Sequence, residues 1–166
     1  SGTGTVSIDQ NSDTGTVTLA ALSATATETT SLTITADGSV TTDSIALAGT
    51  TTDGTLSITV DFDADGSAET LQVVDAITNV NDATLQGTGT DDTVDIDANI
   101  TTTGGALTLT NAALIDVDAQ LNAATNLNLT NATAVNLAET AGVTLTAGGS
   151  VDINTGIGAT GIVLDG

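Results

Sequence analysis

The stretch that decides the fold is NLNLTNATAVNLAETAGVTLTAGGSVDIN, residues 126–154. Pairs of apolar residues separated by one polar or small residue begin at Leu127, Val135, Val143 and Val151, in steps of eight. Thr, Asn and Asp occupy the positions between the apolar residues, and small residues or Asn fill the intervals. Alternation with a period of two residues predicts short, half-buried β-strands.

The same pattern recurs along the whole chain, from Val6/Ile8 to Ile162/Leu164, so the chain is predicted to be all-β. Asn-Gly hairpin turns are absent and the sequence has no Pro. Corners of small residues and Asn favour a parallel β-solenoid, or β-helix, in which each turn stacks on the last. At about 20 residues per turn, the chain would form around eight layers.

Residues 126–154 resemble the repeats of filamentous-haemagglutinin-type bacterial surface proteins. Those repeats share an L-x-L-x-A-G-G-x-V-x-I/L pattern, which VTLTAGGSVDI (residues 143–153) follows closely, with Val at the first position. The resemblance extends over roughly residues 100–166. It implies a right-handed parallel β-helix and a place in a bacterial surface fibre.

Two segments are predicted from this pattern. Residues 86–166 form a parallel solenoid, and residues 1–85 form a β-rich part that is either solenoid or an antiparallel β-sandwich. Helix-like spacing also occurs in residues 67–83 and 111–125. Because Val, Thr, Asn and Asp are poor helix formers, strands are expected there, with a short helix as the alternative.

The composition excludes several classes of function. The 166 residues include 21 Asp and Glu but no Lys, Arg, His or Cys, for a formal net charge of -21. Without cationic side chains the chain cannot neutralise phosphates, so we expect no nucleic-acid partner. Zinc sites and thiol, imidazole or Schiff-base chemistry need residues that the chain lacks. With Phe62 as its only aromatic residue, the chain also lacks stacking groups for a sugar substrate, and we expect no enzyme.

The sharpest local motif is DFDADGSAE, residues 61–69. Alternating Asp residues followed by Gly allow a loop to wrap around a hard cation, since Gly permits the sharp turn. The motif resembles the calcium loops of extracellular repeat proteins, which end in Asp where this chain has Glu69. The predicted calcium ligands are Asp61, Asp63, Asp65 and Glu69. The alternative is an acidic, solvated turn.

A second acidic stretch, GTGTDDTVDID (residues 87–97), resembles a single copy of the Gly-rich calcium repeats of secreted toxins. It adds Asp91 and Asp92 as weaker candidate calcium ligands. Asp95 and Asp97 are instead expected on the outer face of the strand that contains Val94 and Ile96.

These features predict a structural function. We expect a subunit or repeat segment of an extracellular fibre, adhesin stalk or surface-layer filament, assembled end to end and stabilised by cations. Val163 and Leu164 near the end suggest that another turn or subunit follows. The alternative is a carbohydrate-binding or adhesive module of a secreted surface protein. No apolar run is long enough for a membrane span, and glycans are possible at the sequons of Asn99, Asn128 and Asn131.

Overall fold

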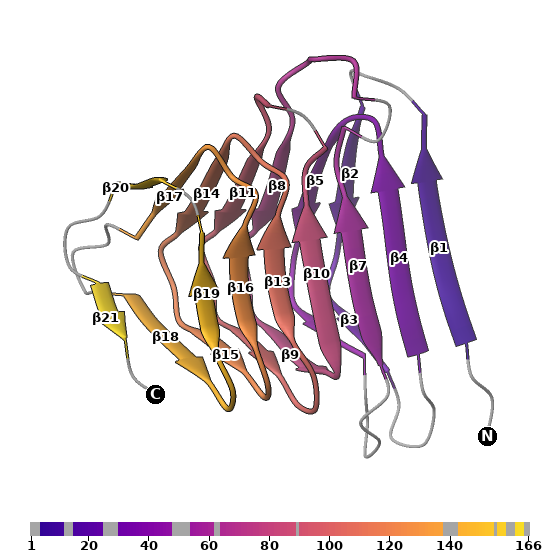
Figure 1. The fold of residues 1–166 in the computed structure, drawn as a ribbon. Helices are drawn as coiled ribbons and strands as arrows, with labels where there is room; N and C mark the ends of the chain where they lie inside the picture. The colour runs from indigo at the N-terminus through magenta and orange to yellow at the C-terminus, as the bar shows by residue number, and fades with distance from the viewer. Residues whose placement is uncertain are drawn as a thin grey trace.

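A computed structural model describes residues 4–11, 15–24, 30–47, 54–61, 64–88, 90–137, 143–154, 156–158 and 162–164. The described chain is a β-solenoid made of three parallel sheets (Figure 1). Successive strands pass from sheet A to sheet B to sheet C and then return to sheet A one layer further along the axis. The colours of Figure 1 therefore run in order along the stack.

Each sheet contains seven strands. Sheet A comprises β1 (Gly4–Gln10), β4 (Thr30–Ala36), β7 (Thr55–Thr59), β10 (Asp82–Gln86), β13 (Leu107–Thr110), β16 (Leu127–Thr130) and β19 (Val151–Ile153). Sheet B comprises β2 (Thr16–Leu19), β5 (Ser39–Thr42), β8 (Thr70–Val73), β11 (Thr93–Ile96), β14 (Leu114–Val117), β17 (Ala134–Asn136) and β20 (Gly156–Gly158). Sheet C comprises β3 (Leu22–Ser23), β6 (Ile45–Ala46), β9 (Ile77–Val80), β12 (Ile100–Thr102), β15 (Leu121–Ala123), β18 (Val143–Ala147) and β21 (Ile162–Leu164).

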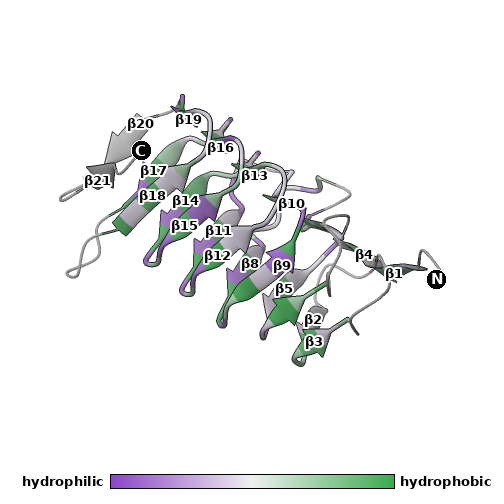
Figure 2. Ribbon diagram, turned by 90° about the horizontal axis from the view of Figure 1, so that it is seen from below, coloured by the Kyte–Doolittle hydropathy of each residue, from purple (hydrophilic) through white to green (hydrophobic). Residues whose placement is uncertain are grey.

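Alternation along each strand buries the aliphatic side chains in the centre of the solenoid and leaves the Thr, Asn and Asp side chains more exposed. Figure 2 shows the hydrophobic and hydrophilic residues that share these strands. The parallel register stacks like residues from layer to layer. One such stack in sheet A is Ile8, Ile34, Ile58, Leu85, Leu109, Leu129 and Ile153. Its five inner members are fully buried. Each buried Leu or Ile contributes about 1.5–3 kcal/mol, so these ladders stabilise the fold along its whole length.

The predicted parallel solenoid is confirmed, and it includes residues 1–85 where they are described. Strands β1, β4 and β7 pair in parallel, so the antiparallel sandwich alternative is wrong for this part. The helix alternatives are also wrong. Residues 67–83 contain β8, β9 and the start of β10, and residues 111–125 contain β14 and β15. Val74, which suggested a helical spacing, is 51% exposed just after β8.

Most of the described turns are longer than the predicted length of about 20 residues. The described part of each sheet therefore has seven strands and not eight. Thr110 and Thr130, which stack on adjacent turns, are 20 residues apart. Ser39 and Thr70, which also lie on adjacent turns, are 31 residues apart. The additional residues of this turn include the acidic loop between β7 and β8.

Among the described residues, no helix is long and apolar enough to cross a membrane.

Candidate functional site

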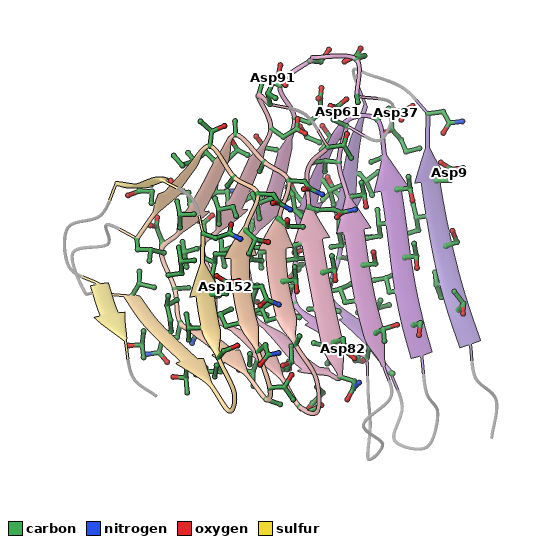
Figure 3. The ribbon with its side chains drawn as sticks, viewed as in Figure 1. Asp9, Asp37, Asp61, Asp82, Asp91 and Asp152 are labelled. Carbon is green, nitrogen blue, oxygen red and sulfur yellow. The ribbon has the colours of Figure 1, made fainter. Side chains whose placement is uncertain are left out.

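The acidic residues of interest lie where the chain leaves sheet A for sheet B. Two loops stack there: the β7–β8 loop, residues 60–69, and the β10–β11 loop, residues 87–92. Figure 3 shows Asp61 and Asp91 at this edge of the solenoid, whereas Asp82 lies at the opposite edge. Residues in the left-handed backbone conformation help the chain to turn at this corner. The φ angle is 49° at Asp61 and 54° at both Asn111 and Asn131. Asp and Asn tolerate this conformation better than other residues with a Cβ.

Asp61 is fully buried and organises the first of the two loops. Its Oδ1 accepts a hydrogen bond from the backbone N–H of Asp65 at 3.2 Å, and its backbone carbonyl accepts one from the N–H of Ala64 at 3.0 Å. The hydroxyl of Thr88, from the neighbouring turn, donates to the same carbonyl and lies 3.4 Å from Asp61 Oδ2. The orientation of Asp61 therefore depends on both turns.

Asp92 is also fully buried and holds the second loop against the first. Its Oδ2 accepts a hydrogen bond from the N–H of Thr88 at 2.9 Å, and its Oδ1 accepts one from the N–H of Glu69 at 3.2 Å. Gly87 leaves the room for this side chain, because a Cβ there would lie 2.6 Å from Asp92 Oδ2. The same Cβ would lie 2.8 Å from the backbone oxygen of Asn111.

Glu69 completes a group of three buried carboxylates, which we call the carboxylate cluster: Asp61, Glu69 and Asp92. One carboxylate oxygen of each residue lies within 4.8 Å of the others. Glu69 is only 5% exposed, and its Oε2 is buried without a hydrogen-bond partner in the described part of the chain. An unsatisfied buried carboxylate oxygen is costly, so this atom distinguishes the cluster from an ordinary acidic turn.

The electrostatics of the carboxylate cluster are unfavourable when all three groups are ionised. Burial, together with the negative charges of Asp61 and Asp92, raises the pKa of Glu69 to about 7. The chain contains no Lys, Arg or His. The charge of the cluster can therefore be balanced only by protons or by a cation from solution.

The structure brings together only some of the predicted ligands. Asp61 and Glu69 meet as expected, and Asp92, which was assigned to a separate site, joins them. Asp65 is exposed, and its Oδ1 accepts a hydrogen bond from the N–H of Ser67 at 2.7 Å. Asp91 is partly buried, and its Oδ1 is buried and has no hydrogen-bond partner among the described residues. Asp63 lies outside the described residues.

Sequence reasoning did not identify Thr88 and Gly87 as parts of the site. Thr88 contacts both Asp61 and Asp92, and Gly87 makes room for the Asp92 side chain. Both lie in residues 87–97, the stretch that resembles a calcium repeat. The prediction assigned this stretch to a second site, separate from the loop of residues 61–69. Thr88 lies next to Asp61 because the intervening turn has the length that stacks the two loops. That length cannot be read from the local sequence of either loop.

The outer face of sheet B carries a second concentration of charge. In register across the strands, Gln72, Asp95 and Asp116 lie side by side. Partial burial and the charges of Asp97, Asp116 and Asp118 raise the pKa of Asp95 to about 6. Asp95 thus faces outward, as predicted, and like charges on adjacent strands destabilise the stack.

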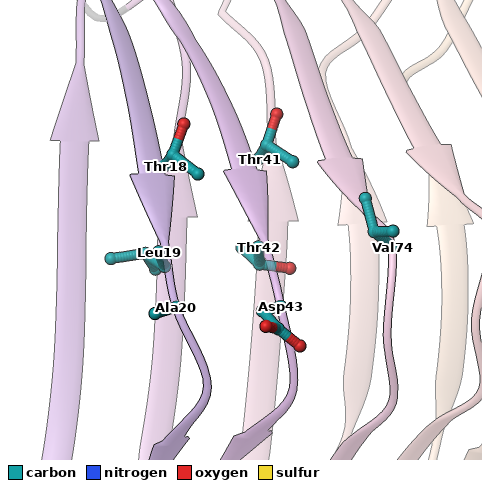
Figure 4. Close-up of a pocket in the computed structure, with 7 residues that line it drawn as sticks. All are labelled: Thr18, Leu19, Ala20, Thr41, Thr42, Asp43 and Val74. Carbon is teal, nitrogen blue, oxygen red and sulfur yellow. The ribbon is translucent and has the colours of Figure 1, made fainter.

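A shallow hollow of about 400 Å³ lies near the first turns, where the chain leaves sheet B. Figure 4 shows its seven lining residues: Thr18, Leu19, Ala20, Thr41, Thr42, Asp43 and Val74. None of these is aromatic, and Phe62 lies outside the described residues. The lining therefore combines aliphatic, hydroxyl and carboxylate side chains.

The three sequons differ in accessibility. Asn99 is exposed, and its Oδ1 accepts a hydrogen bond from the N–H of Gln120 at 2.9 Å. Asn128 is also half-buried, and its Nδ2 donates to the hydroxyl of Thr108 at 3.2 Å. Asn131 is exposed and in the left-handed conformation. The Nδ2 of Asn131 also lies 3.5 Å from the hydroxyl of Thr110 on the adjacent turn.

Comparison of the chain with models of known protein families, with curated proteins and with solved structures found no match. The parallel β-solenoid is compatible with β-helix repeat proteins in general.

Proposed function

We propose that this chain is a structural segment of an extracellular fibre, adhesin stalk or surface-layer filament, extended end to end along the solenoid axis. The observation that carries the proposal is the apolar surface of the first turn. Val6 is 45% exposed and Leu22 is 37% exposed, although both occupy inward-facing positions. Their partners in the next turn, Leu32 and Ile45, are buried. Another turn or another chain stacked on this end would bury both residues.

The exposed strand edges at the two ends of the solenoid also support end-to-end stacking along its axis. Strands β1, β2 and β3 lie at one edge of the three sheets, and β19, β20 and β21 lie at the other. Because the pairing within the sheets is parallel, the edge of a last turn has the direction needed to pair with the edge of a first turn. Exposed strand edges favour such pairing unless they are blocked.

The charge of the chain supports end-on rather than side-by-side contact. With a formal net charge of -21 and no basic residue, the side walls of two copies repel each other. The resemblance of residues 100–166 to filamentous-haemagglutinin-type repeats supports a bacterial surface fibre and an extracellular location. The bacterial surface fibre and the extracellular location rest on this resemblance, because the solenoid fold alone is compatible with many β-helix proteins.

Analytical ultracentrifugation over a range of concentrations, with negative-stain electron microscopy, tests the proposal. We expect the chain to form end-to-end oligomers or filaments, and Val6→Asp with Leu22→Asp to abolish them by placing charge on the stacking surface. The control is Thr5→Asp with Ser23→Asp, which adds the same charge at outward-facing positions of the same strands. A wild-type chain that stays monomeric at high concentration would refute end-to-end assembly of this chain.

A further inference from the structure

We propose that Asp61, Glu69 and Asp92 form a calcium site that joins two successive turns of the solenoid. The ligands come from two loops: Asp61 and Glu69 from the β7–β8 loop, and Asp92 from the β10–β11 loop. The site thus differs from the single-loop calcium motif suggested by residues 61–69. It is also independent of the fibre proposal, because it lies within one chain.

A second observation, besides the grouping of the acids, indicates a ligand. Glu69 Oε2 is buried and has no hydrogen-bond partner in the described part of the chain. A carboxylate oxygen removed from water is normally satisfied by a donor or by a metal ion. Since Glu69 lies against two other buried carboxylates, a cation is the partner that would satisfy the charge of all three.

The surrounding hydrogen bonds hold the other two carboxylates in place. The N–H groups of Thr88 and Glu69 donate to the two oxygens of Asp92, and the N–H of Asp65 donates to Asp61 Oδ1. Hydrogen bonds of this kind orient the ligands of metal sites and lower the cost of assembling them. The ligands are therefore already positioned before the ion binds.

The chemistry of the site favours calcium. Carboxylates are hard ligands, which suit Ca²⁺ and Mg²⁺, and the chain has no softer His or Cys ligands. The three oxygens lie within 4.8 Å of one another, so a single ion can contact all of them. Ca²⁺ accepts flexible coordination by several carboxylates, whereas Mg²⁺ demands near-ideal octahedral geometry and is usually held by only one or two.

Binding of calcium would neutralise the cluster and hold the two turns together. The backbone already links them, because the N–H of Thr93 donates to the carbonyl of Glu69 at 2.9 Å. An ion that binds only when both loops are in place stabilises the folded state by mass action. At a calcium concentration of about 100 times Kd, we expect the Tm to rise by about 5–10 °C.

The test uses the whole chain, freed of metal with EDTA. Isothermal titration with CaCl₂ and with MgCl₂ measures affinity and stoichiometry, and far-UV circular dichroism measures the Tm with and without each ion. We expect one calcium per chain and a Kd for magnesium at least ten times higher. Glu69→Gln and Asp92→Asn should each lose at least nine-tenths of the calcium affinity.

Two control variants distinguish this site from a general effect of charge and from the single-loop motif. Asp152→Asn removes one charge from an exposed position on β19 and should leave calcium binding unchanged. Asp65→Asn removes a ligand of the single-loop motif and should reduce affinity less than Asp92→Asn. Glu69→Gln removes one negative charge and so relieves repulsion within the carboxylate cluster. In EDTA, the Tm of this variant should therefore equal or exceed that of the wild type. That result would show that the variant is folded and that its loss of calcium binding is not due to misfolding.

Three results would overturn the proposal. The first is equal calcium binding by the wild type and Glu69→Gln, or no binding by either. The second is loss of binding in Asp65→Asn with retention in Asp92→Asn, which would assign the ion to the single loop. The third is equal affinity for magnesium and calcium, which would reject calcium as the specific ion. Failure of filament assembly would leave this proposal intact.

Discussion

Asp95→Asn should stabilise the protein, and the gain should depend on pH. Asp95 pairs with Asp116 on one neighbouring strand and with Gln72 on the other. Its pKa is raised from 3.8 to about 6, first by burial and then by the charges of Asp97, Asp116 and Asp118. An amide at this position removes the charge and can donate a hydrogen bond to Asp116.

The size of the effect follows from the shift in the pKa of Asp95. A change from 3.8 to about 6 corresponds to about 3 kcal/mol if it is not screened. Asp95 is only partly buried, so solvent screening reduces the expected gain to about 1 kcal/mol. For a chain of this size, that gain corresponds to a rise in Tm of about 2–4 °C.

The sign of the pH dependence is fixed by the direction of the shift. Because the pKa of Asp95 is higher in the folded state, folding favours the protonated carboxyl. The wild type should therefore lose stability as the pH rises from about 4 to about 6. Asp95→Asn should match the wild type near pH 4 and exceed it above pH 6.

Thermal unfolding by far-UV circular dichroism, from pH 4 to 8 at low ionic strength, measures this difference. Asp152→Asn is the matched control, since it removes the same charge from an exposed strand position. A gain that is the same at pH 4 and pH 7, or a loss of stability in Asp95→Asn, would refute the reasoning. Equal gains in both variants would assign the effect to net charge instead of the Asp95 ladder.

Three other substitutions test the packing and the corners. Leu85→Ala, in a fully buried ladder position, should cost about 2–5 kcal/mol in urea unfolding, compared with about 0.5 kcal/mol or less for the outward Thr84→Ala. Gly87→Ala should cost about 1–3 kcal/mol by the same measurement, because the added Cβ overlaps Asp92. Asn131→Ala should lower the Tm more than Asn131→Gly, because its φ of 54° disfavours a Cβ without a compensating side-chain hydrogen bond.

The fold was predictable because the solenoid repeats one simple rule. Alternating apolar residues predicted the strands, and Asn or small residues at the corners favoured parallel stacking over hairpins. The helix-like spacing of Leu71, Val74 and Ile77 was misleading, since Leu71 and Ile77 belong to different sheets. In the structure, Leu71 and Val73 are both buried on the same strand, so burial follows a period of two residues.

The carboxylate cluster was only partly predictable, because its residues meet through the stacking of turns. Asp61 and Glu69 share one loop, so their proximity could be inferred from a known calcium motif. Asp92 is 23 residues from Glu69 and reaches it only because Thr93 stacks on Thr70. Without the length of each turn, the sequence assigns these acids to two sites.

The carboxylate cluster differs from the acidic residues on the outer faces of the sheets, and this difference motivates the proposed cation. On the outer faces, amides accompany the carboxylates: Gln72 Nε2 donates to Asp97 Oδ2 at 2.8 Å, and Asn136 Nδ2 donates to Asp116 Oδ1 at 2.8 Å. These groups remain near water, which screens the remaining repulsion. Glu69 has neither advantage, because it is buried against two carboxylates and its Oε2 accepts no hydrogen bond in the described chain. Parallel stacking alone does not require this arrangement, since the corners at Asn111 and Asn131 turn with short, uncharged loops. The proposed ion would supply the counter-charge that the amides supply on the outer faces.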